Sequence, residues 1–163
     1  MCGRMQKKKT KLQDELVLFA YIRIHKRLPD QFNAKQLVKG KSWRTIERYL
    51  DDLQECMDFH YWDLRPGYEC ENIAPKLRCL YRNAYLLREI MNAAEEGRFW
   101  EESYPQIFER PRISAARVQD IYEVEVGFEG IPLRDVQRDI HTCMNLMLEI
   151  QEMNGKEDVW GFW

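Results

Sequence analysis

The sequence predicts a mainly α-helical protein with small β-hairpins, in which a unit of helix, turn, helix and hairpin occurs twice. Three observations predict this fold. Residues 42–53 have the apolar spacing of an amphipathic helix, residues 132–143 match them position for position, and a candidate hairpin turn follows each stretch. An internal repeat is harder to obtain by chance than one amphipathic helix, so the two matches support each other.

The composition predicts a globular protein that is neither secreted nor embedded in a membrane. A chain of 163 residues with 45% hydrophobic and 32% charged residues forms one domain or two small ones. Its longest apolar run, residues 16–22, is far shorter than the ~20 residues that cross a bilayer, and its lysine-rich start lacks a signal peptide's apolar core. We therefore expect a cytoplasmic protein. The five cysteines include no C-x-x-C pair, which favours reduced thiols over a metal site.

The charge is unevenly distributed along the chain, although the net charge is only −2. Residues 1–57 hold 13 lysines and arginines against 7 acidic residues, whereas residues 58–163 hold 12 against 20. A basic front half suits attraction to phosphate, and the acidic rear half needs a different partner or a local basic face.

The front half is predicted to contain three short helices. A helix over residues 12–27 is followed by an extended link, and Asn33 is expected to cap a second helix over residues 34–39. Gly40 ends that helix. Ser42 stands where the N-cap of the third belongs, because its hydroxyl can accept from a free amide of the first turn.

The third helix is predicted to be buried on one side only. Its apolar face consists of Trp43, Ile46, Leu50 and Leu53. Its polar face consists of Arg44, Thr45, Glu47, Arg48 and Asp51. A recognition helix in a DNA major groove needs this design, and an ordinary amphipathic surface helix has it too.

A hairpin is predicted directly after this helix. The aromatic-rich residues 59–63 and 67–71 flank Leu64-Arg65-Pro66, which reads as the turn. Arg65 would then lie at the tip of a wing, where it could touch a DNA backbone.

Residues 12–71 resemble the winged helix-turn-helix domain of DeoR-like bacterial regulators. The resemblance rests on Ser42-x-Arg44-Thr45-Ile46-x-Arg48-x-Leu50-x-x-Leu53, which follows the S-x-R-T-I-x-R-D-L-x-x-L signature of that family. Tyr49 stands where the family usually has aspartate, and the second helix is shorter than the family's. The resemblance implies a transcription regulator that binds double-stranded DNA. A compact regulator without a sensing domain is typical of phage and mobile elements.

In this interpretation the third helix reads the duplex, since an arginine can satisfy both acceptors of a guanine. Base edges or flanking phosphates would be contacted by Arg44, Thr45, Glu47 and Arg48, in the helix that Ser42 begins. Phosphates would be held by Lys35, Lys39, Lys41 and Arg65. A second reading face would consist of Arg134, Gln137, Arg138 and His141.

A long helix is predicted over residues 75–96, because Pro75 is tolerated in a first turn and apolar residues recur behind it. It either joins two modules as a core helix or pairs two chains as a homodimer. Residues 98–112 fit one helix interrupted at Pro105 or two short helices. The predicted domains are a basic module (1–73), a linking helical segment (74–110) and an acidic module (111–163).

The acidic module repeats the basic one. Ser114 begins a helix to about residue 125, followed by a glycine-containing turn over residues 127–130. In the stretch that follows, Leu133 matches Trp43, Arg134 matches Arg44, Val136 matches Ile46, Arg138 matches Arg48 and Ile140 matches Leu50. Asp139 supplies the aspartate that the first copy lacks. Asn154-Gly155 between alternating stretches predicts a second wing.

Two functions stay open. The first is the sequence-specific DNA-binding regulator. The second is a winged-helix protein-binding module, such as a phage inhibitor of a host defence complex, because carboxylates crowd the second reading face. These carboxylates are Glu123, Glu125, Glu129, Asp135 and Asp139. A replication initiator is a third, less favoured interpretation. The sequence contains no nucleotide-binding, metalloprotease or serine-hydrolase motif, so we expect neither an enzyme nor a cofactor.

Overall fold

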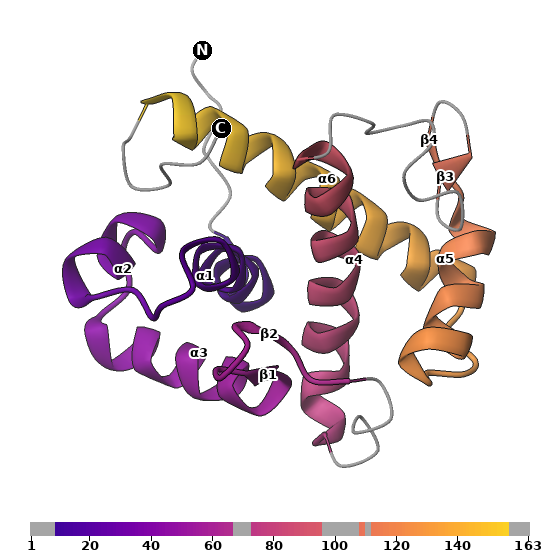
Figure 1. Ribbon diagram of the computed structural model, residues 1–163, viewed down its shortest axis with the longest axis horizontal. Helices are drawn as coiled ribbons and strands as arrows, with labels where there is room; N and C mark the ends of the chain where they lie inside the picture. The colour runs from indigo at the N-terminus through magenta and orange to yellow at the C-terminus, as the bar shows by residue number, and fades with distance from the viewer. Residues whose placement is uncertain (1–8, 67–72, 96–107, 110–111, 157–163) are drawn as a thin grey trace.

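The computed structural model describes residues 9–66, 73–95, 108–109 and 112–156. Its helices are α1 (Lys11–His25), α2 (Gln31–Leu37), α3 (Trp43–Cys56), the 3-10 turn η2 (Pro75–Leu77), α4 (Arg78–Glu95), α5 (Ala115–Ile121), the π-helical segment η3 (Tyr122–Val126) and α6 (Leu133–Lys156). Its strands are β1 (Met57–Asp58), β2 (Asp63–Leu64), β3 (Phe108–Glu109) and β4 (Arg112–Ile113), paired as two antiparallel hairpins. The prediction of a mainly α-helical protein with small hairpins is confirmed (Figure 1).

Helix α1 lies at the centre of the front half. It is buried at nine consecutive positions, from Asp14 to Ile22, as expected for a helix that other elements surround on all sides. It packs against α2, α3, α4 and α6, and Figure 1 shows it end-on between them. Thr10 and Gln13 form a reciprocal capping box that fixes where α1 begins.

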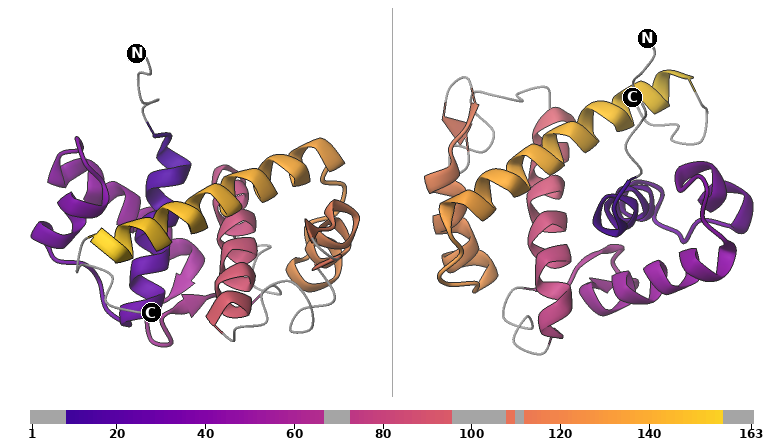
Figure 2. Two further views of the ribbon diagram at one scale, coloured as in Figure 1. Left: turned by 90° about the horizontal axis from the view of Figure 1, so that it is seen from above. Right: turned by 180° about the vertical axis from the view of Figure 1, so that it is seen from behind.

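Helix α4 packs on two sides, against α1 and against α6 (Figures 1 and 2). Its buried apolar residues, with the last residue of η2, are Leu77, Leu80, Tyr81, Ala84, Leu86, Leu87, Ile90 and Met91. One hydrophobic core therefore runs from Leu16 to Ile150 and includes both halves of the chain. The predicted long helix is confirmed, but its apolar stripe is covered within the chain and gives no support to the predicted homodimer through residues 75–96.

The second helix begins earlier than predicted. Asp30, not Asn33, is its N-cap, because the Asp30 carboxylate accepts a hydrogen bond of 2.8 Å from the Asn33 backbone amide. The Asn33 side chain instead donates to the Tyr21 hydroxyl at 3.0 Å, which ties α2 to α1. Gly40, with φ +82°, forms the predicted turn before α3.

The first hairpin also lies earlier than predicted, and Arg65 is not at its tip. Met57 pairs with Leu64, and Asp58 pairs with Asp63. The turn forms over residues 59–62 because Asp58 accepts from the His60 amide through its side chain (2.9 Å) and from the Trp62 amide through its carbonyl (2.8 Å). The second predicted strand, residues 67–71, lies outside the described residues.

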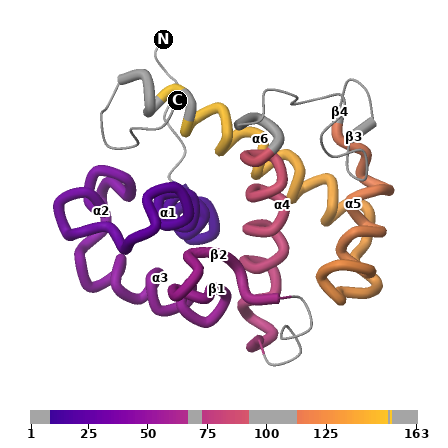
Figure 3. The backbone as a smooth tube through the Cα atoms, viewed as in Figure 1, coloured from indigo at the N-terminus to yellow at the C-terminus, as the bar shows by residue number. Residues whose placement is uncertain are grey.

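The prediction of a second wing at Asn154-Gly155 is wrong, because α6 continues as one helix through both residues to Lys156 (Figure 1). The tube in Figure 3 shows α6 running from beside α5 across α4. Leu146, Met147 and Ile150 extend its buried stripe, and this packing outweighs a local preference for a turn. Residues 157–163 lie outside the described residues. Of residues 98–112, Phe108–Glu109 and Arg112 form strands rather than helix.

Candidate nucleic-acid interface

Helix α3 starts at the predicted residue. The Ser42 hydroxyl oxygen accepts a hydrogen bond from the Thr45 amide at 3.2 Å and donates to the Thr45 hydroxyl oxygen at 3.1 Å. The Ser42 carbonyl accepts from the Ile46 amide at 3.0 Å. Ser42 and Thr45 therefore hold the start of α3 in place, and the hydroxyl groups of both side chains already form hydrogen bonds within the protein.

We expect Ser42→Ala to destabilise the protein by about 1 kcal/mol, because the Thr45 amide loses its acceptor. Ser42→Asp keeps an acceptor at the same position and is expected to stay within a few tenths of a kcal/mol of the wild type. Urea unfolding followed by circular dichroism measures both. Equal losses in the two variants would show that the cap is not what stabilises this end of α3.

The face that α3 turns to solvent is the predicted one. Arg44, Glu47, Arg48 and Asp51 are exposed, and Thr45 is half-buried. The buried side consists of Ile46, Tyr49, Leu53 and Cys56. Trp43 and Leu50 were predicted to be buried but are half-buried, whereas Tyr49 is buried, so the buried face of α3 is rotated toward Tyr49. Within the part of the chain that the structure describes, Arg44 and Arg48 pair with no carboxylate, and they lie one helical turn apart.

The three lysines near the start of α3 differ in exposure. Lys35 and Lys39 are exposed, whereas Lys41 is half-buried. Asp14 is 3% exposed, and burial raises the pKa of its carboxyl, while the charges of Lys41 and Lys9 oppose that shift. Lys35 and Lys39 are therefore the more exposed of the three cations.

Arg65 folds back on the end of α3. Its side chain donates to the carbonyls of Glu55 (3.1 Å) and Gln54 (3.4 Å), and its own carbonyl accepts from the Tyr81 hydroxyl. These bonds satisfy the last carbonyls of α3 and connect the hairpin to α4. The position of Arg65 favours a structural role over the predicted backbone contact.

Two carboxyl groups, those of Glu15 in α1 and Asp52 in α3, lie together where these helices pack. Glu15 is 4% exposed and shares a hydrogen bond with Asp52, which also forms an ion pair of 3.0 Å with Lys11. Burial, with the hydrogen bond and charge of Asp52, raises the pKa of Glu15 to about 9. Burial alone would raise the pKa of Asp52, but hydrogen bonds from Glu15 and Lys11 outweigh it and lower that pKa. Glu15 is thus the protonated partner at neutral pH.

The start of α6 repeats α3 in exposure as well as in sequence. Buried Ile46, Tyr49, Leu53 and Cys56 correspond to buried Val136, Asp139, Cys143 and Leu146. Exposed Arg44, Glu47, Arg48 and Asp51 correspond to exposed Arg134, Gln137, Arg138 and His141. The α5 start is also as predicted, because the Ser114 hydroxyl accepts from the Arg117 amide at 3.3 Å. The repeat is therefore present in the side-chain environment of both helices.

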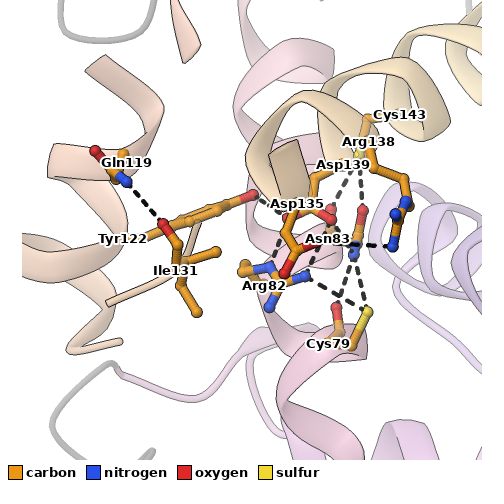
Figure 4. Close-up of polar contacts among 10 residues, drawn as sticks. All are labelled: Cys79, Arg82, Asn83, Gln119, Tyr122, Ile131, Asp135, Arg138, Asp139 and Cys143. Atoms are coloured by element: carbon orange, nitrogen blue, oxygen red, sulfur yellow. Dashed lines mark hydrogen bonds and ion pairs between the residues drawn. The ribbon is translucent and has the colours of Figure 1, made fainter. Parts of the chain in front are cut away.

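Asp139 does not face the second reading surface, contrary to the prediction. It is 3% exposed and lies between α4, η3 and α6 (Figure 4). Arg82 donates to its two oxygens at 2.5 and 3.1 Å, the Asn83 side chain donates at 3.1 Å, and the Tyr122 hydroxyl donates at 2.9 Å. Burial and the neighbouring Asp139 raise the pKa of Tyr122, so its hydroxyl keeps the proton that it donates.

The same cluster holds two thiols. The Cys143 sulfur donates to the Asn83 carbonyl at 3.3 Å, and burial raises the pKa of this thiol well above its usual value. Burial also raises the pKa of Cys79. Neither sulfur is in the thiolate form that a nucleophile needs at neutral pH. Sequence reasoning missed this cluster, because Arg82 and Asn83 are far from Asp139 along the chain.

Comparisons with known proteins give no assignment. No protein-family model matches the chain, and neither curated proteins nor solved structures give a match. None of the described helices is long and apolar enough to cross a membrane. Among the described residues, no group of three or more histidine, cysteine, aspartate or glutamate side chains is placed to hold a metal ion.

Proposed function

We propose that this protein binds double-stranded DNA through α3, as a transcription regulator of the winged helix-turn-helix type. The observation that carries the proposal is the outward face of α3, where Arg44 and Arg48 are exposed one turn apart. Each can take both acceptors of a guanine or bind phosphate oxygens. The capped start at Ser42 and the buried opposite face would keep the two guanidinium groups at a fixed spacing, which base reading requires.

The hairpin after α3 and the lysines before it complete the proposed footprint. Lys35 and Lys39 are exposed near the start of α3 and would bind phosphates. At the hairpin turn, His60 and Tyr61 are exposed, and Tyr61 is 73% accessible. We assign the tip of the proposed wing to these two residues in place of Arg65.

Selection of bound duplexes from a random library tests this proposal. The wild type should enrich one motif, and Arg44→Ala/Arg48→Ala should lose it, since each good arginine–guanine pair contributes about 1–3 kcal/mol of discrimination. Arg44→Lys/Arg48→Lys is the matched control. It keeps both charges but cannot form the paired hydrogen bonds, so it should retain affinity for duplex and lose the motif. A motif retained by the alanine variant would refute reading by α3.

A second candidate is a protein-binding module in the rear half. It is supported by the exposed carboxylates of Glu123 and Glu125, which flank Val124 in the chain, and by the exposed Glu129 shortly after them; Val124 is 78% exposed. An acidic face with an apolar centre suits a basic protein surface. If no duplex is enriched by the wild type, this candidate takes precedence over DNA binding.

A further inference from the structure

The exposed face of α6 has the design of the α3 face without its acidic residues. Both faces carry arginines at the first and third positions, Arg44 and Arg48 in α3, Arg134 and Arg138 in α6. At the second and fourth positions, α3 has Glu47 and Asp51, whereas α6 has Gln137 and His141. The four side chains of the α3 face therefore sum to zero charge, and those of the α6 face sum to +2 with a neutral histidine.

Two carboxylates in the same stretch of α6, Asp135 and Asp139, could offset that charge, and the structure takes Asp139 out of the face. Asp139 is buried and neutralised by Arg82, so its charge does not reach the outer face. Asp135 lies 3.7 Å from Arg138, but the Arg138 side chain is 75% exposed. A solvent-exposed ion pair of this kind is weak, and a phosphate can compete for the same guanidinium. Arg134 pairs with no carboxylate among the described residues.

The two faces lie at different ends of the molecule. Helices α2 and α3 form one end and α5 with the start of α6 forms the other, with α4 between them in each view (Figures 1 and 2). One arginine pair therefore cannot substitute for the other at the same group of phosphates. Each face needs its own stretch of duplex.

We propose that the start of α6, with Arg134, Gln137, Arg138 and His141 exposed, is a second contact for the phosphate backbone of duplex DNA. This inference rests on the proposed DNA-binding function and assigns it a second surface. Charge complementarity selects the partner, because phosphates attract the two exposed arginines of this face. Asp139 was predicted from the sequence to be among the carboxylates of this face, but it is buried.

Binding of a fluorescent duplex of about three helical turns, measured by anisotropy across a salt series, tests the inference. Arg134→Ala/Arg138→Ala is expected to weaken binding at least about tenfold at low salt. It should also reduce the slope of log affinity against log salt by about two, because each lost phosphate contact removes about 0.9. Arg134→Lys/Arg138→Lys should bind as the wild type does. All four side chains are exposed, and thermal unfolding verifies that the variants fold.

A reciprocal exchange of the neutral and acidic positions is the sharper control. Gln137→Glu/His141→Asp gives α6 the acids of α3 and should weaken binding, whereas Glu47→Gln/Asp51→His removes the acids from α3 and should strengthen it. Unchanged affinity and slope in Arg134→Ala/Arg138→Ala, with a loss in Arg44→Ala/Arg48→Ala, overturns this inference and leaves the proposed function intact. A loss in Arg134→Ala/Arg138→Ala with no change in Arg44→Ala/Arg48→Ala overturns the proposal that α3 contacts the bases and retains the α6 contact. No binding by the wild type overturns both.

Discussion

Replacing Asp139 by alanine is expected to destabilise the protein by about 3–5 kcal/mol, because it leaves a buried charge without its partner. The Arg82 side chain is 12% exposed, and Asp139 accepts two hydrogen bonds from it. Burial would lower the pKa of Arg82, but its bonds and charge interaction with Asp139 outweigh burial and raise it. Without Asp139, Asn83 and the Tyr122 hydroxyl also lose their acceptor. Urea unfolding at neutral pH measures the loss.

Two variants test whether the loss comes from the buried ion pair or whether any substitution in this part of α6 destabilises the protein. Asp135→Ala lies one turn earlier on the same helix and removes a carboxylate whose partner is exposed, so it should cost less than about 1 kcal/mol. Asp139→Leu/Arg82→Met removes both buried charges and should recover the part of the loss that comes from the unpaired Arg82 charge, because an apolar pair of similar volume replaces a buried ion pair well. The part that comes from Asn83 and Tyr122 remains, since both still lack the Asp139 acceptor. A double variant no more stable than Asp139→Ala would refute this explanation.

The sequence predicted α3 well because local rules govern that segment. Ser42 caps the helix through a contact within its own first turn, and the 3.6-residue period places Arg44 and Arg48 on the outer face. The exact buried stripe was less predictable. Trp43, Tyr49 and Leu50 can all be buried, and the packing of α1 and α2 against α3 decides that Tyr49 is the most buried of the three.

The wrong predictions have a common physical cause, which is contact between distant segments. Asp139 is a surface residue by composition, but Arg82 and Asn83 on α4 form a polar site for it inside the core. Asn154-Gly155 is a strong turn signal, but the buried residues of α6 before it favour continuing the helix. Both cases follow from the position of α4 between α1 and α6, which no local pattern specifies.

Replacing Glu15 by glutamine is expected to stabilise the protein at neutral pH and to flatten its stability profile. Glu15 is 4% exposed and shares a hydrogen bond with Asp52. Two carboxyl groups can share such a bond only if one of them is protonated. A glutamine amide can donate to Asp52 in the same way and has no proton to lose.

The direction of the stability change with pH follows from the pKa of Glu15, which is about 9 in the folded protein against 4.5 for the free side chain. Between these values the unfolded chain releases a proton that the folded protein holds. Stability therefore falls as pH rises, by up to about 1.4 kcal/mol per pH unit. Glu15→Gln removes this term and should gain at most about 3 kcal/mol at pH 7. The lowered pKa of Asp52 acts with the opposite sign and only at acidic pH, where stability is lost as pH falls.

Urea unfolding at pH 5, 6, 7 and 8 measures this prediction, because the wild-type and Glu15→Gln curves should diverge steadily over that range. Glu47→Gln, which removes the same charge from an exposed position of α3, should give a curve parallel to the wild type. Parallel curves for Glu15→Gln would show that Glu15 is ionised in the folded protein. Because glutamine keeps the bond between α1 and α3, Glu15→Gln should also leave duplex affinity at pH 7 unchanged. A gain in stability without a change in binding would show that the Glu15 site stabilises the fold beneath α3 and does not affect the exposed face that contacts DNA.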